Sequence, residues 1–183
     1  MNALESLLRI CPPPEGPDLG PRGRPAANAG DGPAVPPSHA ELVKRYGAGC
    51  FDDFLWIYEE ECPNEYLDIG QQTREAYDIL SQADIPEIRS MLNEFGAVPE
   101  ELIQWGRTDN ADSLFWIPSG APEDWPTLIV SAGQLDFLLV RSTSPGVVLG
   151  LLERSIRCSF VPAEFFDTAP TFERWREELT QED

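Results

Sequence analysis

Carboxylates dominate the side chains of this chain that could do chemistry, and they gather in one part of the sequence. Glu59, Glu60 and Glu61 are three acids in a row, and residues 52–84 hold ten carboxylates against a single base, Arg74. Such a concentration of negative charge attracts basic partners. We therefore predict that Glu59, Glu60 and Glu61 contact a partner, although a run of acids can also serve solubility alone.

A second acidic pair, Asp109 and Asp112, could in principle ligate a metal ion. A calcium loop has oxygen ligands at alternate positions and a glycine at the sixth, but Ala111 and Leu114 occupy those places here. The pattern instead favours a polar hairpin turn in which Asp109 and Asn110 accept local backbone hydrogen bonds. We expect no metal, and we treat this turn as the second candidate contact surface.

The parts of a catalytic site do not come together in the sequence. His39 is the only histidine, and no serine or cysteine has a recognisable base partner. Asp52 and Asp53 are adjacent, and adjacent strand residues point to opposite faces, so they do not share a pocket. The four cysteines lack zinc-site spacing, and residues 47–49 (Gly-Ala-Gly) lack the lysine of a phosphate loop. We expect no catalytic residues and no cofactor; a carboxylate-based hydrolase is the least favoured alternative.

The negative charge is distributed unevenly along the chain. The first 50 residues hold five acids and five bases, so the whole net charge of −19 falls on residues 51–183. This predicts a basic protein partner, with no nucleic-acid partner and no membrane surface. No apolar run is long enough to span a bilayer, and Glu5 interrupts the only signal-like stretch. We therefore expect a cytoplasmic protein.

Residues 35–57 predict a short helix, a glycine turn and an aromatic strand. Ser38 and Glu41 have the spacing of a capping box for the helix. Gly47 suits the left-handed conformation that ends many helices. Residues 51–57 (Phe-Asp-Asp-Phe-Leu-Trp-Ile) then supply the bulky side chains of a strand.

Helical and strand patterns alternate in the rest of the chain. Residues 1–10 have the leucine spacing of a short amphipathic helix, and residues 11–37 hold nine prolines and five glycines, which predict a flexible linker. Asn64 can cap the helix that follows the acidic run. Helices are expected over 64–80, 86–95, 144–152 and 172–179, and strands over 102–108, 113–118, 126–132, 134–141 and 156–160.

Aromatic motifs stand in a specific order between residues 35 and 166. They are Tyr-Gly-Ala-Gly at 46–49, Phe-Asp-Asp-Phe-Leu at 51–55, Trp-Gly at 105–106, Thr-Asp-Asn at 108–110, Phe-Trp at 115–116, Trp-Pro at 125–126 and Phe-Val-Pro-Ala-Glu-Phe-Phe at 160–166. Together they resemble the SUKH superfamily, the immunity-protein-like domains of bacterial toxin systems. We expect Trp105, Trp116 and Trp125 to lie in the core, with their indole N–H groups bonded to the backbone.

The resemblance implies a domain organisation and a fold. The SUKH-like domain covers 35–166, after a short helix over 1–10 and a Pro/Gly-rich linker over 11–34, and before an acidic helix or tail over 167–183. The fold is α+β, with a mostly antiparallel sheet and helices packed on it and at its flanks.

The resemblance and the charge together predict a protein-binding domain that performs no chemistry. An immunity protein or antitoxin that neutralises a toxin is the favoured function. The acidity fits a nuclease-type toxin domain, because the cleft of a nuclease must be basic to hold phosphates. The alternative is a regulatory or scaffold domain with another partner, since the superfamily is not confined to toxin systems.

Overall fold

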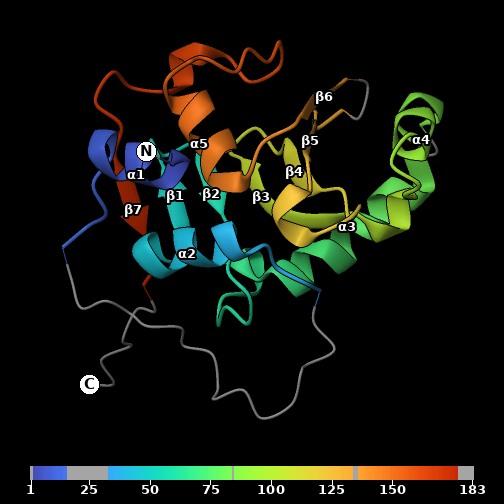
Figure 1. Cartoon of the computed structure of the whole chain (residues 1–183), viewed down its shortest axis with the longest axis horizontal. Helices are drawn as coiled ribbons and strands as arrows, with labels where there is room; N and C mark the ends of the chain where they lie inside the picture. Colours follow the sequence, from blue (N-terminus) through green and yellow to red (C-terminus); the bar gives the residue numbers. More distant parts are fainter. Residues whose placement is uncertain (1, 16–32, 84, 134–135, 177–183) are drawn as a thin grey trace, which may run out of the picture.

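The chain has an α+β fold, as predicted (Figure 1). The computed structural model describes residues 2–15, 33–83, 85–133 and 136–176, with 81–83 as backbone only. Within these ranges, seven strands form one antiparallel sheet in the spatial order β6-β5-β4-β3-β2-β1-β7. The strands are β1 Gly49–Phe51, β2 Leu55–Ile57, β3 Ile103–Thr108, β4 Ser113–Trp116, β5 Thr127–Val130, β6 Phe137–Val140 and β7 Phe172–Arg174.

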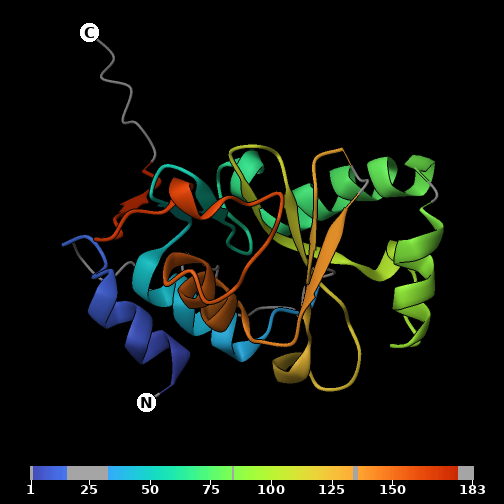
Figure 2. The same cartoon turned by 90° about the horizontal axis from the view of Figure 1, so that it is seen from above.

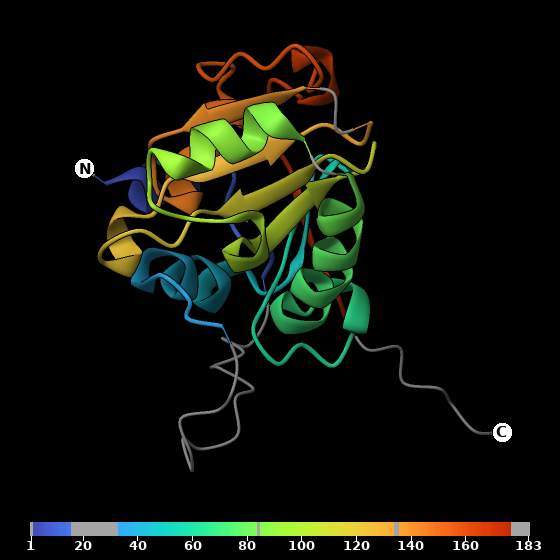
Figure 3. The same ribbon diagram turned by 90° about the vertical axis from the view of Figure 1, so that its right-hand side faces the viewer.

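Helices cover both faces of the sheet (Figures 2 and 3). One face packs against α1, α2 and α5, and the other against α3 and α4. The helices are α1 Ala3–Ile10, α2 Pro37–Tyr46, α3 Ile69–Ala83, α4 Pro86–Asn93 and α5 Ser144–Leu152, and a 3-10 turn, η1 Glu65–Leu67, precedes α3.

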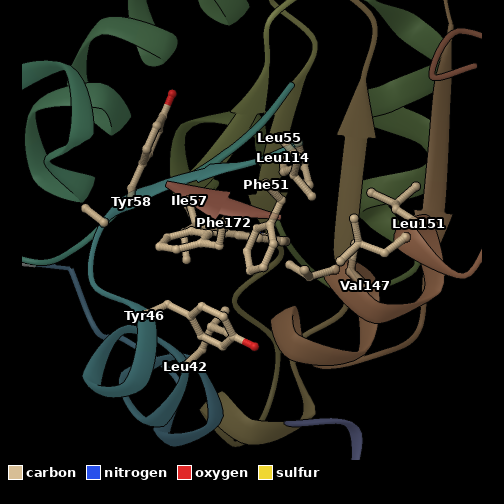
Figure 4. Packing of buried hydrophobic residues seen from close by; sticks show 14 of the residues in the cluster. Leu42, Tyr46, Phe51, Leu55, Ile57, Tyr58, Leu114, Val147, Leu151 and Phe172 are labelled. Atoms are coloured by element: carbon tan, nitrogen blue, oxygen red, sulfur yellow. The ribbon is translucent and has the colours of Figure 1, made fainter. Parts of the chain in front are cut away.

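Alternation along the strands builds two apolar cores. Leu114 and Ile129 point into the core under α1, α2 and α5, whereas their chain neighbours Phe115 and Leu128 point into the core under α3 and α4. This follows from the two-residue period of a strand. Figure 4 shows the first core, in which α2 contributes Leu42 and Tyr46, the strands Phe51, Leu55 and Leu114, and α5 Val147 and Leu151.

The three predicted core tryptophans are buried, but of their indoles only that of Trp125 has the predicted bond to the backbone in the part of the chain that the structure describes. Trp125 donates from Nε1 to the Gly120 carbonyl oxygen at 3.3 Å. Nε1 of Trp105 is buried and has no acceptor among the described residues. The rings of Trp116 and His39 pack against it, and both His39 nitrogens are already bonded elsewhere. The aromatic packing therefore outweighs one lost hydrogen bond.

The predicted capping box at the start of α2 is wrong. The helix begins at Pro37 with Pro36 at its N-cap, so Ser38 is already inside the first turn. Proline favours this first position because its fixed φ suits a helix and it has no N–H to satisfy. The Ser38 hydroxyl is buried and has no hydrogen-bond partner among the residues that the structure describes, while the Ser38 N–H donates to the Glu123 carboxylate at 3.0 Å. The prediction for Gly47 is confirmed, with φ +77° at the C-cap.

Two predictions near the C-terminal end are also wrong. Residues 156–160 form no strand and contribute only an isolated bridge between Cys158 and Val161. The helix expected from residue 172 is instead the edge strand β7, which pairs with β1. Phe172 packs its ring on Phe51 and Tyr46, and this tertiary contact outweighs the local helical pattern. Residues 177–179 of that expected helix lie outside the described residues.

The predicted N-terminal helix is confirmed as α1. Asn2 and Glu5 form a capping box at its start, and Leu7 is buried against the rest of the core. Cys11 is also buried, and its carbonyl oxygen accepts a hydrogen bond from the Tyr46 hydroxyl. Most of the predicted linker, residues 16–32, lies outside the described residues.

The single aromatic strand predicted over 51–57 is wrong: Asp52 and Asp53 adopt positive φ and turn the chain, so β1 and β2 form an antiparallel hairpin there. The other predicted helices and strands are present, with ends shifted by a few residues. The main shift is at α3, which begins at Ile69, while Asn64 caps the separate turn η1. None of the described helices combines the length and apolarity needed to cross a bilayer.

Candidate functional site

The acidic run lies in a loop that hydrogen bonds hold in one shape. The loop joins β2 to α3, and Glu59 receives a backbone bond from Ile69 while its own N–H donates to Leu67. The Asp68 carboxylate accepts from the N–H of Gln71 at 2.7 Å, at the start of α3, and from the N–H of Cys62 at 3.2 Å. Both ends of the loop are therefore tied together beside the sheet.

The three predicted contact acids take different positions on this loop. The Glu59 carboxylate accepts a 3.3 Å bond from the N–H of Ala48, so it supports the start of β1. Glu60 and Glu61 are exposed. Partial burial and the neighbouring charges of Glu61 and Asp68 raise the pKa of Glu60. Glu60 and Glu61 therefore present negative charge to solvent, whereas Glu59 is largely structural.

The same loop carries an exposed aromatic side chain. Tyr66 is 63% exposed, and its neighbour Glu65 is also exposed. Both lie in η1, whose first turn is capped by the Asn64 side chain through the Tyr66 N–H. The prediction from sequence missed Tyr66 because it assigned residues 64–80 to one helix, in which an aromatic side chain is expected to face the core. A rigid, exposed tyrosine is a typical anchor of protein interfaces.

The second predicted contact surface is only partly at the surface. Asp109 is exposed, but Asp112 is 3% exposed. Its carboxylate accepts bonds from the Thr108 hydroxyl at 2.6 Å and the Ala132 N–H at 3.1 Å. Asp112 therefore closes the β3–β4 turn, which corrects its place among the predicted contacts.

The two predicted acidic surfaces lie at opposite ends of β2. The N–H of Asp109 donates to Phe54, just before β2, whereas the N–H of Tyr58, just after β2, donates to Trp105. Glu59 follows Tyr58 directly. The structure therefore does not bring the acidic run and the hairpin turn together into a single cluster.

A cleft of about 260 Å³ lies between α3 and the sheet. Its buried amides are already bonded: Gln104 donates to the Ser113 hydroxyl oxygen at 3.3 Å, and Gln72 to the Glu75 carboxylate at 3.1 Å. Arg107 adds a positive charge to the lining. The Ser113 hydroxyl therefore faces an amide rather than a general base, and the cleft offers no activated nucleophile there.

Potential metal ligands are also dispersed. Across the described ranges, no group of three or more His, Cys, Asp or Glu side chains could hold a metal ion. All four cysteines are free thiols, three of them buried. Burial is the main cause that raises the pKa of Cys11 to about 11, so that thiol is a poor nucleophile near neutral pH.

Comparisons with known proteins add no relative to this picture. No family model matches the chain, and searches of curated proteins and of solved structures returned no match. The resemblance to the SUKH superfamily therefore stays a prediction from the residues of the chain.

Proposed function

We propose that this chain is a non-catalytic protein-binding domain that neutralises a basic toxin domain, as an immunity protein does. The observation that carries the proposal is the loop between β2 and α3, which exposes Glu60, Glu61 and Glu65 together with the ring of Tyr66. A loop that exposes both an aromatic side chain and several like charges is typical of a surface that binds a partner of opposite charge.

The rigidity of this loop supports the proposal. Residues at both ends of the loop are bonded to each other, and the Asp68 carboxylate ties the middle of the loop to α3. The backbone that carries the carboxylates is thus fixed before binding, so little backbone entropy is lost when a partner docks. A preorganised acidic surface also accelerates encounter with a basic protein.

The same surface suggests how neutralisation would work. A nuclease holds its substrate through lysine and arginine contacts to phosphates. Glu60, Glu61 and Glu65 placed over those cations would occupy the positions of the phosphates, and Tyr66 would supply apolar contact. Inhibition then needs only occlusion of the cleft, without any reaction.

The proposal is tested by expressing the chain together with the product of each adjoining gene. We expect one of these products to be toxic alone, to be tolerated when the chain is present, and to co-purify with it in a stoichiometric complex. Adjoining products that are harmless and do not bind would contradict the toxin proposal and favour the regulatory or scaffold alternative.

A further inference from the structure

A groove at the β7 end of the sheet lies outside the loop surface described above. Cys50 of β1 pairs directly with Trp56 of β2 and with Glu173 of β7, so these three side chains share one face of the sheet. The same row of cross-strand pairs continues to Val130, which α3 and α4 cover. The groove is therefore the continuation of the α3/α4 face toward the β7 edge.

Two half-buried tryptophans line this groove. Its volume is about 690 Å³, and Asp53 and Trp175 join Cys50, Trp56 and Glu173 in its lining. Trp175 is held by a 2.9 Å bond from its N–H to Ala48, which extends the β1–β7 ladder by one pair. The backbones of Trp56 and Trp175 are thus fixed in the sheet, and both residues are partly exposed.

The charge on the groove is mainly negative. Asp53 and Glu173 are exposed, and neither carboxylate has a hydrogen bond or ion pair within the described part of the chain. After burial itself, the charges of Asp53, Asp109 and Glu173 are the next causes that raise the pKa of the Cys50 thiol. Their negative potential therefore converges on the floor of the groove.

The two arginines of the lining do not balance this charge equally. Arg174 turns its guanidinium away from the groove and donates to the carbonyl oxygens of Tyr46 and Arg45. Arg176 lies exposed at the rim. Arg107 pairs with Trp56 on the same face of the sheet but lines the neighbouring cleft. Asp53 and Glu173, with Asp109 nearby, therefore outnumber Arg176 and Arg107 on this face.

We propose that this groove binds a lysine or arginine side chain of the basic protein partner. Indole rings attract cations through their faces, and the carboxylates of Asp53 and Glu173 supply the counter-charge. Trp175 also lines a small hollow with Glu59 and Glu61, so the groove adjoins the acidic loop. This inference rests on the proposed function and gives the partner a second, specific anchor point.

The five tryptophans make the groove directly observable by NMR. The full chain is titrated with a blocked hexa-arginine peptide, and the indole N–H signals are assigned with the variants Trp56→Phe and Trp175→Phe. We expect the signals of Trp56 and Trp175 to shift while those of buried Trp105, Trp116 and Trp125 stay in place. A hexa-lysine peptide should act in the same way, and a hexa-glutamate peptide should move none of them.

Paired substitutions locate the counter-charge. The double variant Asp53→Asn/Glu173→Gln should weaken peptide binding roughly tenfold, because two exposed charge pairs are lost at up to about 1 kcal/mol each. The control Glu94→Gln/Glu100→Gln removes the same charge from exposed sites on the α4 side and should leave binding within about twofold.

Two results would overturn the proposal that the groove binds a basic side chain. One is an arginine peptide that shifts neither groove indole; the other is a shift that Glu60→Gln/Glu61→Gln abolishes and Asp53→Asn/Glu173→Gln does not. Both results leave the acidic loop and the proposed function standing. Failure of the proposed function has a different signature, in which the peptide occupies the groove but no adjoining gene product binds.

Discussion

At the scale of single residues, His39 connects three elements of the fold. Its Nε2 lies 2.8 Å from the Tyr58 carbonyl oxygen and therefore carries the proton, while Nδ1 lies 3.0 Å from the Ser144 hydroxyl and accepts from it. These bonds join α2 to the end of β2 and to the first turn of α5. Burial is the main cause that lowers the pKa of His39 from 6.5 to about 4, so the fold holds a neutral imidazole.

This burial predicts a loss of stability in mild acid. Above about pH 6.5 the imidazole is neutral in both states; as the pH falls to about 4, the unfolded chain binds a proton that the folded chain excludes. The free energy of unfolding should therefore fall by roughly 3 kcal/mol from this residue between these two pH values. Urea unfolding of the parent and of His39→Gln at pH 7 and pH 4.5 measures the effect.

The carboxylates titrate in both proteins, so the difference between them isolates His39. The stability advantage of the parent over His39→Gln should shrink as the pH falls. An advantage that is the same at both pH values would contradict a neutral, buried histidine.

At the scale of elements, the close approach of β1 and β7 depends on a glycine. A Cβ at Gly49 would lie 2.2 Å from the Glu173 carbonyl oxygen and 2.6 Å from Cζ of Phe172. Because the nearest atom belongs to the backbone, β7 would have to move away. Gly49→Ala should therefore lower the free energy of unfolding by about 1–3 kcal/mol, as overpacked sites do.

Gly133→Ala is the matched control for this prediction, because no atom of the described part of the chain lies within 4 Å of a Cβ at that position. It should leave stability within about 0.5 kcal/mol. Thermal unfolding of both variants, with hydrogen exchange of the Cys50 amide as a local readout, checks the result. Equal stability of the two variants would show that β7 is not docked as described.

The elements also show what the sequence could and could not predict. Helices α4 and α5 and strands β3 to β6 follow from local periodicity, and the structure confirms them. β7 could not be predicted from the local sequence, because Phe172 of this strand packs on Phe51 and Tyr46, which lie more than 100 positions earlier in the chain. The loop acids were found by charge alone, but the burial of Asp112 and the exposure of Tyr66 depend on tertiary packing.

At the scale of the whole molecule, the chain pairs a densely packed two-layered core with a surface of high negative charge. The net charge of −19 falls wholly beyond residue 50, on the part of the chain that builds the sheet. Exposed charges act over roughly 8 Å at physiological ionic strength. Binding of a basic partner should therefore be fast at low salt and should slow steeply as salt rises.

The most direct test of this account is the association rate of the chain with its partner from the co-expression experiment, measured at low and high salt. Glu60→Gln/Glu61→Gln/Glu65→Gln should associate more slowly than the parent by about tenfold at low salt and with a flatter salt dependence. The fold should be unchanged, since exposed substitutions shift stability by about 0.5 kcal/mol. A triple variant that associates as fast as the parent, with the same salt slope, would contradict recognition through the acidic loop.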